Sequence, residues 1–75
     1  MNTCIASISS LNLSIKAQKA LSDNRIFCRI ISLDPALTKR GCAYGIEFAC
    51  SEERNVKFIL RKAGVYPSQF IKKEL

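Results

Sequence analysis

The chain contains no histidine among its 75 residues. Histidine is a frequent general base and metal ligand near neutral pH, so its absence excludes Ser/His/Asp hydrolytic sets and histidine-containing zinc sites. The four cysteines form no C-x-x-C pair, the spacing typical of zinc and iron–sulfur sites. A phosphate-binding loop and a paired-carboxylate pattern are also missing. We therefore expect no conventional enzyme, no metal site and no cofactor.

Long apolar runs are missing as well. The most hydrophobic stretch, residues 26–33, is short and includes Arg29, whereas about 20 apolar residues are needed to cross a bilayer. The first ten residues have no basic segment, and serines interrupt their apolar residues, so they do not match a secretory signal. We expect a cytoplasmic protein without a membrane span, whose cysteines are all free thiols.

The residues that are present suit one globular domain spanning 1–75. Hydrophobic residues make up 48% and charged residues 24%, which is ordinary for a folded protein. The net charge of +6 could attract nucleic acid or another anionic partner. The basic residues are dispersed, however, and Tyr44 and Phe48 fall on the expected core side, which leaves Phe27 as the exposed aromatic candidate. Nucleic-acid binding is therefore not favoured.

The first half of the chain predicts a strand, a helix and a second strand. Residues 3–9 alternate as a strand does, and Ser9 or Ser10 can cap the amphipathic helix expected over 11–23. Residues 26–33 are rich in β-branched side chains and too few for a typical helix, so they predict the second strand.

The second half predicts a strand, a helix and a last short strand. Residues 42–50 alternate large and small side chains. Ser51 offers an N-cap for a helix that Gly64 ends, and residues 69–73 form the final strand. The helix has an apolar stripe made of Val56, Ile59, Leu60 and Ala63.

The predicted order β-α-β-β-α-β indicates an α+β fold of the ferredoxin-like type. Right-handed crossovers place two helices on one face of a four-stranded antiparallel sheet. In the natural register for the second and third strands, charged residues face each other and apolar residues face each other. The expected pairs are Arg29 with Glu47, Ile30 with Ile46, and Cys28 with Phe48.

Cys42 is the thiol with the most reactive predicted surroundings. It follows Lys39, Arg40 and Gly41 at a boundary between loop and strand. Nearby cations favour the nucleophilic thiolate, and glycine can turn backbone N–H groups toward an anion. Alternatively, Cys42 only begins the core face of its strand and the two cations keep the loop soluble. The remaining cysteines are expected to be small buried hydrophobes: Cys4, Cys28 and Cys50.

Four segments resemble the putative selenium/sulfur carrier protein-like family: Ser10, residues 15–21, Asp34-Pro35 and residues 41–46. The resemblance covers nearly the whole chain, although Ala43 stands where the family usually has glycine after its cysteine. It implies a small carrier, not a catalyst, that holds sulfur or selenium on Cys42, with Lys39, Arg40 and Gly41 stabilising the charged form. Its partners would be sulfur or selenium donor and acceptor proteins.

A different class of function also fits the sequence. The chain could be a non-catalytic interaction or regulatory domain that forms a homodimer through one face of its sheet. The residues expected on that face are Phe27, Ile31, Leu33 and Ala43.

Overall fold

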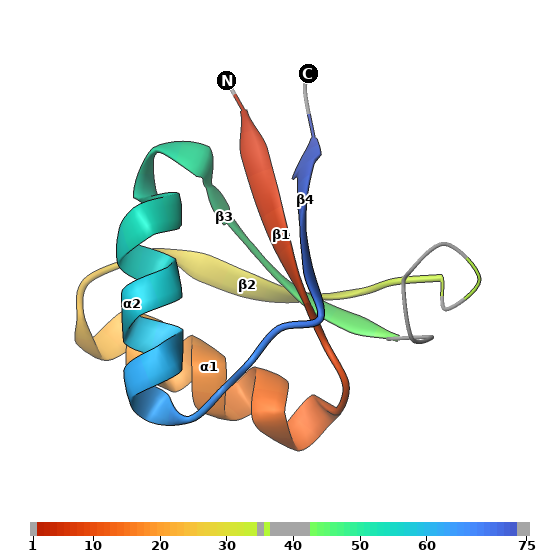
Figure 1. Ribbon diagram of the computed structural model, residues 1–75, viewed down its shortest axis with the longest axis horizontal. Coiled ribbons are helices and arrows are strands. Elements are labelled where there is room, and N and C mark those ends of the chain that lie inside the picture. Colours follow the sequence, from red (N-terminus) through yellow and green to blue (C-terminus); the bar gives the residue numbers. More distant parts are fainter. Residues whose placement is uncertain (1, 35, 37–42, 74–75) are drawn as a thin grey trace.

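The structure is a computed structural model that describes residues 2–34, 36 and 43–73. Its elements are β1 (Thr3–Ile8), α1 (Leu11–Asp23), β2 (Cys28–Ser32), β3 (Tyr44–Ala49), the 3-10 turn η3 (Cys50–Glu52), α2 (Glu53–Ala63) and β4 (Gln69–Lys73). The strands form one antiparallel sheet in the order β2-β3-β1-β4, and both helices cover the same face (Figure 1). The predicted α+β, ferredoxin-like architecture is confirmed.

The register between β2 and β3 is the predicted one. Arg29 lies opposite Glu47, Ile30 opposite Ile46, and Cys28 opposite Phe48. Arg29 Nε donates to Glu47 Oε1 at 2.6 Å. Because the Arg29 side chain is 67% exposed, this ion pair contributes little stability, and its main effect is to disfavour a shifted register.

Helix α1 has the predicted bounds, and Ser10 is its N-cap. The Ser10 hydroxyl accepts a hydrogen bond from the Leu13 N–H at 3.1 Å, which satisfies one of the unpaired N–H groups at the helix start. The strand that follows begins two residues later than predicted. Ile26 belongs to the turn that closes α1, because its N–H donates to the Leu21 carbonyl at 2.9 Å.

The start of α2 differs from the prediction. Ser51 is not its N-cap: η3 intervenes, and Glu52 precedes the helix without a capping bond from its side chain. The reason lies in β3, which ends at Ala49, one residue earlier than expected. The Cys50 N–H still donates to the Asn2 carbonyl at 3.2 Å, and the chain then turns through η3. The other end is as predicted, since Gly64 closes α2 with a φ of 81°, a left-handed conformation suited to glycine.

The core lies between the helices and the sheet. It is built from the alternate residues of β1 and β3 that face the helices, together with the buried stripes of α1 and α2. Phe48 is buried in this core and Tyr44 is half-buried, whereas Phe27 is 88% exposed, as the sequence predicted. The buried apolar members are Cys4, Ala6, Ile8, Ala17, Leu21, Ile26, Cys28, Ile46, Phe48, Val56, Leu60 and Val65.

The expectation of free thiols is wrong for two of the cysteines. Cys4 and Cys50 form a disulfide, with their Cα atoms 5.0 Å apart. The pairing of β1 with β3 explains the contact. Cys4 lies opposite Phe48, and Cys50, two residues beyond Phe48, turns toward the same face of the sheet. This long-range neighbour relation is not visible from the cysteine spacing.

The face of the sheet opposite α1 and α2 is covered at its centre by aliphatic side chains. Gly45 in β3 lies between Ser7 of β1 and Ile31 of β2. A Cβ atom added at Gly45 would be 2.8 Å from Ile5 Cγ2 and 2.9 Å from Leu33 Cδ1. Glycine at this position therefore lets Ile5 and Leu33 pack directly over the β3 backbone.

The disulfide should contribute a large share of the stability of so small a domain. The bonded cysteines are 46 residues apart, and loop-closure entropy for this length corresponds to about 4 kcal/mol. Reducing the bond should therefore lower the urea midpoint of unfolding strongly. The Cys42→Ser variant, which keeps the disulfide, should respond to reductant as the parent chain does. Equal midpoints with and without reductant would contradict this assignment.

Substitution of Gly45 by valine should destabilise the chain by about 1–3 kcal/mol, because the new side chain overlaps Ile5 and Leu33. Ala49→Val is the matched control, since Ala49 is exposed and lies on the same strand and face. Valine favours strands, so the control should be neutral or slightly stabilising. Urea unfolding of both variants is the measurement, and equal effects would rule out overpacking at Gly45.

Candidate functional site

The predicted sulfur site lies outside the described residues. Cys42, Lys39, Arg40 and Gly41 all belong to the segment 37–42. Their assigned roles therefore remain predictions. The described residues nearest to this segment along the chain are Ala36 and Ala43.

Hydrogen bonds hold the described residues on either side of the segment 37–42. The Leu33 N–H donates to the Ala43 carbonyl at 2.7 Å, so the β2–β3 ladder extends one step beyond the Ser32–Tyr44 pair. The Ala36 N–H donates to Asp34 Oδ1 at 3.0 Å, the local bond by which aspartate favours a turn. Ala43, the residue directly after Cys42, is thus fixed at the start of β3.

The other cysteines lie at the opposite end of the sheet. Cys4 and Cys28 both pair with Phe48 near the end of β3, and Cys50 follows that strand. Between Tyr44 and Ala49, β3 extends over about 17 Å at the usual strand rise. The described neighbour of Cys42 is therefore separated from the remaining cysteines by the length of β3.

None of the described cysteines offers a reactive free thiol. Cys4 and Cys50 are bonded to each other. Cys28 is free but buried, with its sulfur 4.0 Å from the Gln18 carbonyl oxygen. Burial raises the pKa of the Cys28 thiol, so it stays protonated at neutral pH and is a poor nucleophile. The prediction of a small buried hydrophobe is confirmed for Cys28. For Cys4 and Cys50 the prediction missed the disulfide that joins them.

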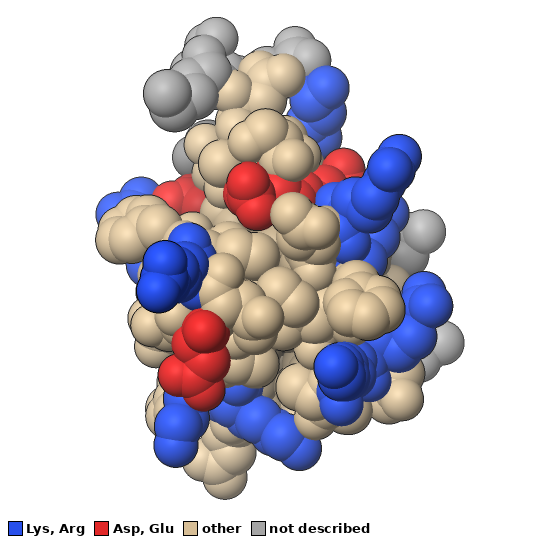
Figure 2. Space-filling view, turned by 90° about the vertical axis from the view of Figure 1, so that its left-hand side faces the viewer, with Lys and Arg blue, Asp and Glu red and all other residues tan. Residues whose placement is uncertain are grey.

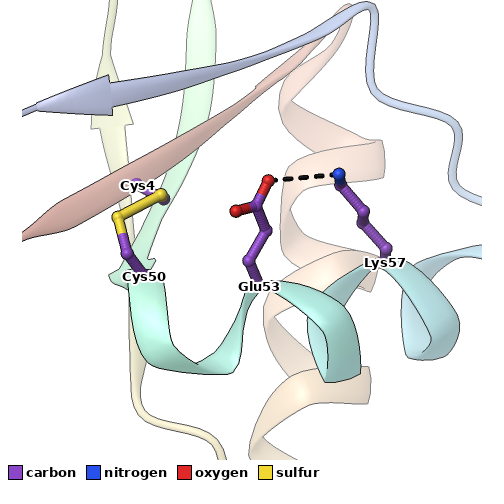
Figure 3. The surroundings of a disulfide bond; sticks show 4 residues. All are labelled: Cys4, Cys50, Glu53 and Lys57. Carbon is purple, nitrogen blue, oxygen red and sulfur yellow. Dashed lines mark ion pairs between the residues drawn. A yellow bond between two sulfur atoms is a disulfide. The ribbon is translucent and has the colours of Figure 1, made fainter.

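The disulfide is a site that sequence reasoning missed. Figure 3 shows it beside Glu53 and Lys57 of α2, whose Oε2 and Nζ atoms are 3.1 Å apart. Lys57 Nζ also lies 4.9 Å from the centre of the Phe70 ring. The available signal was that both cysteines were expected to be small buried hydrophobes, which places each of them on the core side of its strand. Only the pairing of β1 with β3, a long-range contact that strand alternation does not reveal, turns that signal into a bond.

An open cleft beside α2 is lined by Cys50 and by charged and apolar residues of that helix. The residues of α2 in this lining include Arg54, Lys57, Phe58 and Arg61. The Phe58 side chain is well exposed. Glu53 lines the cleft as well, so three basic residues and one acidic residue leave its lining with an excess of positive charge beside an aromatic surface.

Neither a metal-binding group nor a membrane-spanning helix is found among the described residues. In residues 2–34, 36 and 43–73, no group of three cysteine, aspartate or glutamate side chains is placed to hold a metal ion. Neither α1 nor α2 has the length and apolar character needed to span a membrane.

The comparison with curated proteins found no match to this chain. A protein-family model, described as "Putative Se/S carrier protein-like", matches residues 3–72. The match covers every described helix and nearly every strand residue, and it includes the segment that contains Cys42. The chain therefore belongs to the putative Se/S carrier protein-like family.

Proposed function

We propose that this chain carries sulfur or selenium as a persulfide or selenosulfide on Cys42. One observation supports the proposal beyond the family: none of the three other cysteines offers a reactive free thiol. Cys4 and Cys50 are bonded to each other, and Cys28 is buried with a raised pKa. Cys42 is then the thiol left for cargo.

The transfer needs one nucleophilic thiolate and no cofactor. The Cys42 thiolate attacks the outer sulfur of a donor persulfide, the donor leaves as its own thiolate, and a persulfide remains on Cys42. An acceptor thiolate or other nucleophile then takes the outer sulfur. Lys39, Arg40 and backbone N–H groups near Gly41 would stabilise the anionic forms. The chain acts as a carrier and not as an enzyme, in the cytoplasm, between a donor protein and an acceptor protein.

Sulfur loading tests this function directly. After incubation with a cysteine desulfurase and cysteine, the intact mass of the oxidised chain should increase by one sulfur atom. Cys42→Ser should abolish the increase, because it removes the attacking thiolate. Cys28→Ala is the matched control and should still load. Loading of the Cys42→Ser variant, or failure of the parent chain to load, would refute the carrier function.

The two cations before Cys42 should accelerate its reactions. A shift of the thiol pKa from about 8.5 to about 7.5 raises the thiolate fraction at neutral pH roughly eightfold. The double variant Lys39→Gln, Arg40→Gln should therefore slow iodoacetamide labelling of Cys42 about three- to eightfold, measured by peptide mapping. Lys16→Gln, Lys19→Gln on α1 removes the same charge elsewhere and should leave the rate nearly unchanged. An equal rate in all three proteins would disprove the electrostatic activation.

A second candidate rests on the face of the sheet that has no helix in the described part of the chain. Ile5 and Ile71 pair across β1 and β4 on this face, and Ile31 of β2 and Leu33, directly after β2, extend it. Ile31, Leu33 and Ile71 are half-buried, so a second copy of the chain could cover them and form a homodimer. The parent chain's failure to load sulfur would give this interaction function precedence.

A further inference from the structure

The two cysteines of the Cys4–Cys50 disulfide differ in exposure. Cys4 is 2% exposed and lies within the core. Cys50 is only partly buried and lines the cleft on α2. In thiol–disulfide exchange, a thiolate attacks one sulfur while the other leaves. Of the two cysteines, Cys50 is therefore the one at which we expect an incoming thiolate to attack, because Cys4 lies within the core.

We propose that the Cys4–Cys50 disulfide is an exchange site for small anionic thiols, which attack it at Cys50. The proposal goes beyond sulfur carriage and depends on no property of Cys42. It also accounts for a disulfide in a chain that we place in the cytoplasm, where disulfides are usually redox-sensing or catalytic and seldom permanent.

The charge around the cleft selects the substrate class. Lys57 is neutralised by Glu53 at 3.1 Å, but neither Arg54 nor Arg61 forms an ion pair within the described part of the chain. Figure 2 shows basic side chains spread over the side of the molecule that carries α2. Two uncompensated guanidinium groups in the cleft that Cys50 lines attract a thiol that bears carboxylates. The exposed ring of Phe58 adds an apolar surface for its carbon atoms.

The leaving sulfur also has a cation on its side of the sheet. Lys72 of β4 is the cross-strand partner of Cys4 in the antiparallel register. Directly opposite residues extend from the same face of a sheet. Positive charge near a leaving thiolate lowers its basicity and assists its departure.

The exchange balances without a further reactant. The thiolate RS⁻ bonds to Cys50 Sγ, the bond between Cys50 and Cys4 breaks, and Cys4 leaves with the electron pair as a thiolate. A second RS⁻ attacks the substrate sulfur of the mixed disulfide, which releases RSSR and the Cys50 thiolate. Both cysteine thiolates then take protons from water. Two substrate thiols thus supply the two electrons that reduce the disulfide.

Glutathione, which bears two carboxylates, and cysteamine, which bears an ammonium group, are suitable probes. The full chain with Cys42→Ser, in oxidised form, is treated with each thiol, quenched with acid at intervals and analysed by mass and peptide mapping. The first adduct should carry glutathione on Cys50. Arg54→Glu, Arg61→Glu should slow reduction by glutathione several-fold and accelerate reduction by cysteamine. The rate with each thiol is compared only between variants, so the difference in intrinsic reactivity between the two thiols does not affect the result.

Lys16→Glu, Lys19→Glu on α1 is the matched control, because it reverses the same amount of charge outside the cleft. This control should change the rate of reduction by glutathione and the rate of reduction by cysteamine only slightly. Circular dichroism under the same conditions should show a folded chain before the disulfide breaks. Three results would each overturn the proposal: adducts on Cys4, reduction that occurs only in denaturing urea, or equal effects of the two charge reversals on both thiols. Isolation of the oxidised chain without a Cys4–Cys50 bond would overturn it as well.

Discussion

The antiparallel pairing of β1 with β3 is the constraint on which the rest of the structure depends. These two strands form the centre of the sheet, and their register runs from Thr3 opposite Ala49 to Ile8 opposite Tyr44. The pairing brings Cys4 to the end of β3, where Cys50 completes the disulfide. It also sets the start of β3, and with it Ala43, at the other end of β1. One register thus separates the described sulfur atoms from the predicted carrier segment.

Most of the local structure could be predicted because its causes are local. The cap at Ser10, the stripe of α2 and the left-handed Gly64 each depend on residues within a few positions of one another. The β2–β3 register was also predictable, since neighbouring strands joined by one loop leave few alternatives and the Arg29–Glu47 pair selects among them. By contrast, the shift from a Ser51 cap to η3 depends on where β3 ends. Past that end, the Cys50 N–H still bonds to the carbonyl of Asn2, a residue far from it in the sequence.

The candidate site was only partly predictable, for the same reason. Cys42 was selected from its adjacent cations and from the family resemblance, and both are properties of a short segment. The disulfide required the β1–β3 register, and the assumption of a reducing compartment argued against it. Burial of Cys28 followed from strand alternation, but its raised pKa follows from the packing of α1 against β2 around it. Long-range pairing therefore determined what happens to every described cysteine.

The arrangement of the sulfur atoms has a direct chemical consequence for a carrier. In the proposed carrier, every additional free thiolate is another position at which a donor persulfide could deliver its sulfur. Here the disulfide removes two competing thiols, and burial keeps the Cys28 thiol protonated. Reduction of Cys4–Cys50 would restore two thiols and remove the covalent link between β1 and η3. The redox state at one end of the sheet is thereby coupled to the stability of the domain and, in the proposed carrier, to the number of thiols that a donor could load.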